Sequence, residues 1–287
     1  MIRKGERSTI SRFSIGPGVL ISDTVEMNVR KRFLAAFAVV LFLPFYAFFI
    51  EPYWIEVSHH QIQLPVKTPL KVMQLSDLHI RSVGRRERAV LELISNENPD
   101  LIAVTGDFVS DAGNDEAVFA FLRELRAPLG VWLIRGNWEY FKGQNVEPKL
   151  RELSNLKILV NKSARAREDV WVVGLDDFFT GQPDESGAFS GVPDSVMRLA
   201  LFHSPEAFDA MKSHFDLGLS GHTHAGQFRL PFLPPLWLPP ASGRFIEGWY
   251  EREGKKMYVS RGVGNSLIDA RLFCRPEIAI FTIAPMI

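Results

Sequence analysis

Short apolar runs alternate with stretches of helical periodicity from residue 66 onward. Buried strands are predicted at 71–75, 101–105 and 130–134. Helices are predicted between these strands, at 85–97 and 116–125. Further strand-like runs lie at 170–173, 199–202, 217–219, 256–260 and 277–283, with a helical pattern at 205–212. Because strands and helices alternate, we expect an α/β fold built on layered sheets, with antiparallel elements late in the chain.

The N-terminal part of the chain has a different composition. Residues 1–32 are polar and end in three basic residues at 30–32, whereas residues 33–50 carry no charge. Eighteen helical residues reach about 27 Å, just short of a hydrocarbon core of ~30 Å. Tyr53 and Trp54 then supply aromatic side chains that are typical of a membrane interface. We expect a polar extension at 1–32, an anchor helix at 33–50, a linker at 51–65 and one globular domain at 66–287.

A membrane anchor is the favoured interpretation of residues 33–50, while a cleavable signal peptide and a buried core helix remain alternatives. A signal peptide normally has a shorter apolar region and a small-residue cleavage site, and an amphipathic core helix has a polar face. The basic residues 30–32 predict a cytoplasmic N-terminus, so a full span would place residues 51–287 outside. Pro44 and the marginal length also allow partial insertion. We expect a single anchor in the bacterial inner membrane and leave the side of the domain open.

Charge and cysteine content narrow the classes of partner and site. Lysine plus arginine and aspartate plus glutamate both number 33, so the formal net charge is zero. Nucleic-acid binders usually carry a basic excess, so we expect no nucleic-acid partner, and we expect a monomer. Cys274 is the single cysteine, which rules out an intramolecular disulfide and a Cys-x-x-Cys zinc site. Any metal must therefore be held by His, Asp and Asn.

Potential metal ligands directly follow five of the predicted strands. In chain order they are Asp77, His79, Asp107, Asn137, His203, His222 and His224. The carboxyl ends of strands in an open α/β sheet meet at the edge where sites form, so we expect these side chains to converge. Glycines at 106, 136 and 221 allow tight turns and close backbone approach beside them. Each motif alone is weak, and the ordered set is what points to a site.

The types of these residues match two-metal phosphoryl chemistry. Mixed oxygen and imidazole ligands suit Mn²⁺, with Fe or Zn²⁺ as alternatives, whereas Ca²⁺ prefers oxygen ligands only. A carboxylate such as Asp107 can bridge two ions. Two ions about 3.5–4 Å apart can clamp a phosphoryl group, generate hydroxide and stabilise the leaving oxygen. The residues therefore predict a dinuclear centre that hydrolyses a phosphate ester or anhydride.

The ordered set resembles the calcineurin-like metallophosphoesterases over about residues 66–285. The motifs that carry the resemblance are Asp77-Leu78-His79, Gly106-Asp107, Gly136-Asn137, His203 and Gly221-His222-Thr223-His224. The resemblance implies a four-layer α/β/β/α sandwich. It also implies one metal on Asp77, His79, Asp107 and His224, a second on Asp107, Asn137, His203 and His222, and catalytic roles for Asp107, Asn137 and His222. The extended histidine motif and the apolar anchor resemble the membrane-associated branch, which includes bacterial phosphodiesterases and UDP-2,3-diacylglucosamine pyrophosphatases of lipid A synthesis.

One position departs from the family pattern. The family usually reads Gly-Asn-His-Asp/Glu, in which the histidine assists the leaving group, and this chain has Trp138 in its place. An indole has no labile proton to give at working pH. A phosphate leaving group, with a second pKa near 6, departs unprotonated more readily than an alkoxide. Trp138 therefore favours a pyrophosphate bond over an alkyl phosphodiester. His59 and His60 lie outside the motifs, and either remains a substitute acid.

The apolar, proline-rich loop at 228–240 follows the last histidines directly. It is interpreted either as a packed cover of the core or as a surface that meets the bilayer or receives acyl chains. Arg81, Arg135, Arg229 and Arg244 are candidate substrate contacts, because guanidinium groups bind phosphate well. We predict contacts from Arg81 and Arg135, and Arg81 is the best placed, two residues after His79. We expect a lipid-linked phosphate substrate, best represented by UDP-2,3-diacylglucosamine. A broad extracytoplasmic phosphodiesterase or phosphatase and a membrane-tethered interaction protein are the alternatives.

Overall fold

The structure is a computed structural model that describes residues 20–110, 115–141 and 146–286. Its contacts divide the chain into two units, Met1–Pro44 and Phe45–Ile287. Helix α1 (Leu20–Phe49) begins well before the expected anchor at 33–50, because residues 20–32 contain no Gly or Pro that would end a helix. The stretch Arg30–Tyr53 is long and apolar enough to cross a membrane, a test that signal sequences and core helices also meet.

Residues 51–65 differ from the expected linker. The short 3₁₀ helix η1 (Glu51–Tyr53) is followed by β1 (Glu56–Leu64), which pairs in parallel with the last strand, β12 (Glu277–Pro285). The sequence of β1, EVSHHQIQL, is mostly polar and therefore gives no buried apolar run. Its strand conformation is decided by a partner more than 200 residues away.

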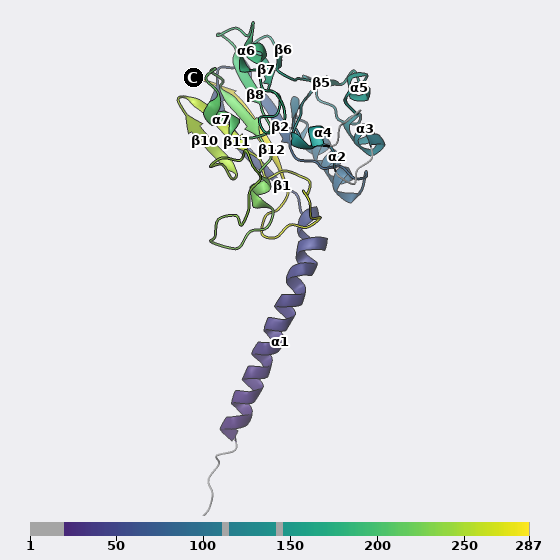
Figure 1. Cartoon of the computed structure of the whole chain (residues 1–287), viewed down its shortest axis with the longest axis vertical. Coiled ribbons are helices and arrows are strands. Elements are labelled where there is room, and N and C mark those ends of the chain that lie inside the picture. The colour runs from purple at the N-terminus through teal and green to yellow at the C-terminus, as the bar shows by residue number, and fades with distance from the viewer. Residues whose placement is uncertain (1–19, 111–114, 142–145, 287) are drawn as a thin grey trace, which may run out of the picture. The chain divides into compact units, whose positions relative to one another are not determined.

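Two six-stranded sheets form the centre of the second unit (Figure 1). The first has the order β1-β12-β2-β3-β4-β5, with β2 (Leu70–Leu75), β3 (Leu101–Thr105), β4 (Val131–Ile134) and β5 (Leu156–Ile158). The second has the order β10-β11-β9-β8-β7-β6, with β6 (Lys162–Arg167), β7 (Val170–Gly174), β8 (Met197–Leu201), β9 (Leu217–Ser220), β10 (Gly248–Arg252) and β11 (Lys255–Val259).

Most central strands run parallel, so their carboxyl ends lie at one edge of each sheet. Strands β2 to β5 are mutually parallel, as are β7, β8, β9 and β11. The expected late antiparallel elements are β10, which pairs with β11, and β12, which pairs with β2. The helices are α2 (Arg85–Glu97), α3 (Asp115–Leu122), α4 (Asn137–Phe141), α5 (Val146–Arg151), α6 (Glu185–Phe189), α7 (Ala207–Ala210) and the 3₁₀ turn η2 (His224–Gly226).

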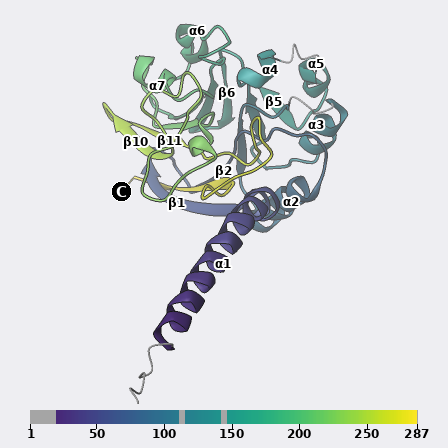
Figure 2. The ribbon, with the colours of Figure 1, turned by 60° about the horizontal axis from the view of Figure 1, so that its bottom comes forward.

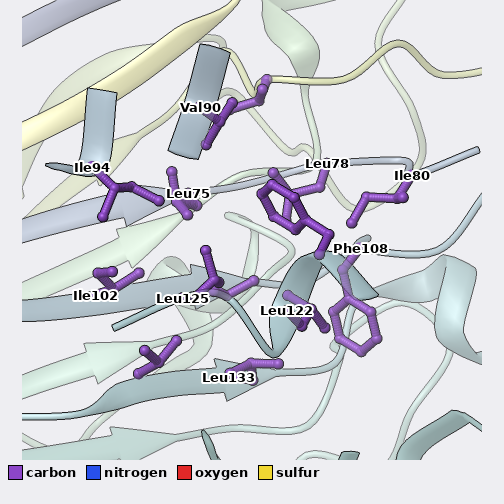
Figure 3. Close-up of a cluster of buried hydrophobic side chains, with 14 of the residues drawn as sticks. Leu75, Leu78, Ile80, Val90, Ile94, Ile102, Phe108, Leu122, Leu125 and Leu133 are labelled. Atoms are coloured by element: carbon purple, nitrogen blue, oxygen red, sulfur yellow. The ribbon is translucent and has the colours of Figure 1, made fainter. Parts of the chain in front are cut away.

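Three apolar cores separate four layers, which confirms the expected α/β/β/α sandwich. Strand β2 alternates between two of them: Val72 faces the second sheet, whereas Met73 and Leu75 face helices α2 and α3. Figure 3 shows the helix side of this sheet, where Leu75 lies among side chains from α2, β3 and α3. The third core lies between the second sheet and α6 and α7, on the opposite side of the sandwich in Figure 2.

The predicted helix at 85–97 and the predicted strand at 101–105 match α2 and β3 residue for residue. Strand β6 was not predicted, because its sequence is mostly polar and it lies at the edge of its sheet. Helix α7 is shorter than the predicted 205–212, since the chain is already extended at Met211.

Candidate metal centre

The seven predicted ligands lie at the carboxyl ends of five strands, as their sequence positions require. Asp77 and His79 follow β2, Asp107 follows β3, Asn137 opens α4 after β4, His203 follows β8, and His222 and His224 follow β9. All seven are buried. Two groups have ligand atoms within 4.8 Å of one another: Asp77, His79 and His224 form the first cluster, and Asp107, His203 and His222 form the second cluster.

Asp107 lies between the two clusters. Its Oδ2 is 3.2 Å from His203 Nε2 in the second cluster and 3.8 Å from His79 Nε2 in the first. Asn137 joins the second cluster, because its Oδ1 lies 3.2 Å from the same His203 nitrogen. The Asp107 carboxylate is therefore placed to serve an ion in either cluster, and the Asn137 amide oxygen to serve an ion in the second cluster.

Ring nitrogens face one another within each cluster. His79 Nε2 is 3.1 Å from His224 Nε2, and His222 Nδ1 is 3.2 Å from His203 Nε2. Backbone carbonyls accept from the opposite nitrogens of three rings: Val109 O from His79 Nδ1 at 3.2 Å, Thr105 O from His203 Nδ1 at 2.8 Å and Pro240 O from His222 Nε2 at 2.6 Å. In a neutral ring the carbonyl takes the N–H and leaves the opposite nitrogen to bind a metal. Carboxylates, an amide oxygen and these inward-facing ring nitrogens are a donor set that fits two metal ions.

The protonation of these groups follows from burial and neighbouring charge. Burial lowers the pKa of His79 to about 4 and that of His224 well below its usual range, with His79 and Arg271 adding to the effect on His224. Burial acts the same way on His203, but the carboxylates of Asp107 and Asp77 outweigh it and raise the pKa of His203 well above its usual range. The first cluster therefore offers neutral imidazoles, which are ready to bind metal.

The backbone beside the ligands is strained. Asp77, His79, Asp107, His222 and His224 all have positive φ, between 42° and 72°. Non-glycine residues rarely adopt this region, and such outliers concentrate at functional sites. Glycines make the close approach possible: a Cβ at Gly221 would overlap Ser76 Oγ and Asp77 Oδ2, and one at Gly136 would overlap Asp107 Oδ1.

Glu139 supports the site and was not singled out in the sequence. It is buried, and its carboxylate accepts the backbone N–H groups of Asp107 at 2.9 Å, Val109 at 3.1 Å and Gly136 at 2.7 Å. Burial and the nearby Asp107 charge raise the pKa of Glu139 to about 7. The signal that could have found it is the acidic position of the family motif Gly-Asn-His-Asp/Glu, which Glu139 fills two residues after Asn137.

Trp138 forms one wall of a pocket beside the metal ligands. Its indole packs edge-on against His79, with ring centroids 5.4 Å apart, and its backbone N–H donates to Asp107 Oδ1 at 2.9 Å. The pocket has a volume of about 300 Å³. Besides Asp107, Asn137, His222 and His224, its lining includes Trp138, Phe228, Leu236, Trp237, Leu267 and Ile268. The metal ligands thus open onto a largely apolar cavity.

The predicted substrate arginines already have protein partners. Arg135 Nη2 pairs with Glu147 at 2.5 Å, and its Nη1 donates to Tyr140 OH at 2.9 Å. Arg81 Nε donates to Ser110 Oγ at 3.1 Å. Arg229 pairs with Glu247 and Arg244 with Asp209, while His59 lies 3.5 Å from Glu97 and His60 stacks on Phe281. Contact of Arg81 or Arg135 with substrate stays a prediction.

Comparison with known proteins places the site in context. A family model described as calcineurin-like phosphoesterase matches residues 70–226. The uncharacterized metallophosphoesterase YkuE of Bacillus subtilis is 32% identical over 255 residues, covering 83% of this chain and 88% of the relative. Phosphodiesterase YaeI of Escherichia coli is 29% identical, covering 88% and 98%. UDP-2,3-diacylglucosamine pyrophosphatase LpxG of Chlamydia muridarum is 26% identical, covering 80% and 90%.

Proposed function

The chain belongs to the calcineurin-like phosphoesterases, and from that premise we propose that it hydrolyses a phosphodiester or pyrophosphate bond in a membrane-associated substrate. It is a metal-dependent phosphoesterase with two buried Asp/His ligand clusters. The observation that carries the proposal is the pocket, which joins metal ligands to apolar walls. A phosphate bound at the ligands has room for the lipid part of its molecule directly beside it.

The protein residues divide the chemical work between the two clusters. Asp77, His79, Asp107 and His224 would hold one ion, and Asp107, Asn137, His203 and His222 would hold the other. Mn²⁺ is our first choice, and Fe or Zn²⁺ suits the same donors. Such a pair of ions supplies hydroxide and neutralises charge on the phosphoryl oxygens. The carbonyls of Val109, Thr105 and Pro240 keep the imidazoles oriented throughout.

The leaving group is inferred to be a phosphate. Trp138 occupies the position from which the family's usual histidine assists departure, and its indole has no proton to give. A phosphate leaves without a general acid because its conjugate acid is far stronger than an alcohol. The cleaved bond is therefore a pyrophosphate in our first hypothesis.

UDP-2,3-diacylglucosamine is the best candidate substrate. Support comes from the apolar pocket and from the similarity to a pyrophosphatase named for that lipid. The second candidate function is a broad extracytoplasmic phosphodiesterase or phosphatase. The similarity to a phosphodiesterase and the basic residues 30–32, which predict an external domain after a full span, favour this alternative.

The membrane is the proposed partner surface. The apolar stretch Arg30–Tyr53 supplies the anchor in a bacterial inner membrane. On the loop at 228–240, Phe232 is fully exposed. The other exposed apolar side chains of this loop are Leu230, Leu233, Leu236 and Trp237. Their exposure beside the pocket supports contact with lipid, since isolated apolar side chains are common on surfaces but clusters mark interaction sites.

Hydrolysis assays test the proposal. Full-length protein in detergent micelles with Mn²⁺ is given UDP-2,3-diacylglucosamine, UDP-glucose and a chromogenic aryl phosphodiester, with Asp107→Ala as the inactive control. We expect the acylated pyrophosphate to be cleaved with the highest kcat/KM. Preference for the phosphodiester supports the second candidate. If none of the three substrates is hydrolysed in an Asp107-dependent way, the hypothesis of a membrane-tethered interaction protein remains. A reporter fused after residue 287 then decides the side of the membrane.

A further inference from the structure

Arg271 is a buried residue that contacts one ligand of the first cluster directly and supports another through the backbone. Its guanidinium is fully buried, and Nη2 lies 3.3 Å from His224 Nδ1. The same nitrogen donates to Arg261 O, Gly262 O and Gly264 O at 3.0, 3.1 and 2.5 Å. This stretch of backbone packs on a second ligand, because Gly264 N donates to Asp77 O at 2.6 Å. Arg271 therefore fixes the backbone that supports Asp77, and its guanidinium lies against the His224 ring.

Cys274 adds a second contact with the same histidine. Its Sγ–H donates to His224 O at 3.2 Å, and its own carbonyl accepts from Arg271 Nη1 at 3.2 Å. The thiol is buried. In segment 271–274, Arg271 thus contacts the side chain of His224 and Cys274 contacts its backbone carbonyl. These contacts fix the turn in which His224 has a strained, positive φ.

Segment 271–274 is itself fixed by Ala47 in the last turn of α1 and by Glu51 in η1. Glu51 is completely buried, and its carboxylate accepts the backbone N–H groups of Phe273, at 2.8 Å, and of Cys274. Ala47 O in α1 accepts the backbone N–H of Arg271 at 2.9 Å. Charge-assisted hydrogen bonds from a buried carboxylate to two backbone amides are strong. A glutamine in place of Glu51 would leave one of the two backbone N–H groups without an acceptor.

We propose that Glu51 is a positioning residue for the metal centre, which fixes segment 271–274 and through it the ligand His224. Glu51, two residues after the end of the apolar helix α1, thereby sets the metal affinity of the first cluster. The second cluster does not share this support, since its histidines rest on Thr105 O in β3 and on Pro240 O. The inference concerns metal retention and holds whichever substrate the enzyme uses.

Metal retention in the full-length protein tests the inference. Protein in detergent micelles is loaded with Mn²⁺, titrated with EDTA, and the retained ions are counted by mass spectrometry. In Glu51→Gln we expect one ion to leave at an EDTA concentration about 10- to 100-fold lower than in the wild type, the usual cost of losing an orienting contact. The second ion should leave at the wild-type concentration, and the spin-coupled Mn²⁺ EPR signal should give way to that of an isolated ion.

Asp169→Asn is the matched control, because Asp169 is also a buried carboxylate that accepts a backbone N–H, from Lys67. It should lower the melting temperature of the metal-free protein as Glu51→Gln does, yet release both ions as the wild type does. Coincident release curves for Glu51→Gln and wild type overturn the inference, as does an equal shift of both ions.

A second pair of variants covers the case in which Glu51→Gln does not fold. Cys274→Ala removes the donor to His224 O, whereas Cys274→Ser keeps a hydroxyl in its place. Early loss of one ion in the alanine variant, restored in the serine variant, supports the inference. An alanine variant that holds both ions like the wild type overturns it.

Discussion

The second ligand cluster is supported by β3 and by the loop at 228–240, whereas the first is supported in part by residues at and just after the end of the apolar helix. In the second cluster, His203 Nδ1 donates to Thr105 O in β3, and the Glu139 carboxylate accepts the backbone N–H of Asp107. In the first, His224 is held by Arg271 and Cys274, whose backbone is fixed by Glu51. The two ligand clusters therefore have supports of different origin.

This difference separates what is generic in the site from what is particular to the chain. Buried parallel strands deliver ligands at their carboxyl ends in many α/β proteins, and both clusters follow that rule. The support of the first cluster is particular to this chain, because it depends on contacts of Ala47 and Glu51 with segment 271–274. Variants that affect one cluster, or both, can measure how independent the two are.

The largest effect is expected from the residue that the clusters share. Asp107→Ala removes the carboxylate that faces both His203 and His79, so both ions should be lost. We expect kcat/KM to fall by at least about 10³-fold, comparable with loss of a major electrostatic stabiliser. Metal content and kinetics measured on the same preparation check this; retention of either ion at wild-type affinity contradicts the bridging role.

Acid should affect the clusters in opposite directions in the metal-free protein. The pKa of His79 is about 4 in the folded protein against 6.5 unfolded, so below pH 6.5 the unfolded state binds a proton that the folded state resists. Its contribution to the free energy of unfolding therefore falls by about 3 kcal/mol between pH 6.5 and 4, at roughly 1.4 kcal/mol per unit.

The raised pKa of His203 gives the reverse sign: its stabilising contribution is complete below pH 6.5 and disappears as the pH rises through the folded value. Denaturant unfolding of the metal-free wild type, His79→Gln and His203→Gln across this range separates the two terms. The His79 variant should lose the acid-side slope and the His203 variant the alkaline-side slope. Identical slopes in all three proteins contradict the assignment.

Glu139→Gln is the counterpart of Glu51→Gln on the other cluster. The amide cannot accept all three backbone N–H groups of Asp107, Val109 and Gly136 with equal strength. We expect metal affinity to fall about 10- to 100-fold, first at the ion held by His203 and His222. Chelator titration checks the order of release, and prior loss of the ion at His224 would falsify the division of supports.

The smallest effect is expected from Trp138, which touches both clusters through its ring and its backbone. Trp138→His restores a side chain that can give a proton to a leaving oxygen. We expect turnover of an alkyl phosphodiester to rise about tenfold or more, less than the roughly 10²- to 10⁴-fold of a well-placed general acid, while that of a pyrophosphate stays nearly constant. Trp138→Phe is the control for size, and equal gains on both substrates contradict a phosphate leaving group.

The sequence alone determined the identity and chain order of the ligands. Each follows a buried apolar run, and a run of that kind predicts its own strand, as at β3. Because the ends of parallel strands meet at one edge of their sheet, the convergence of Asp77 and Asp107 followed from local patterns, whereas His203 joins them from the second sheet. Helix α2 was predictable for the same reason, since its periodicity and its ends are local features.

Only the tertiary structure decided how the ligands are grouped, oriented and supported. The carbonyl of Pro240 fixes the tautomer of His222 from inside an irregular loop, and Glu51 reaches Cys274 across 223 positions of the chain. Strand β1 likewise exists because β12 lies beside it. These contacts join distant segments whose own sequences carry no periodic signal, so only packing against a folded partner determines them.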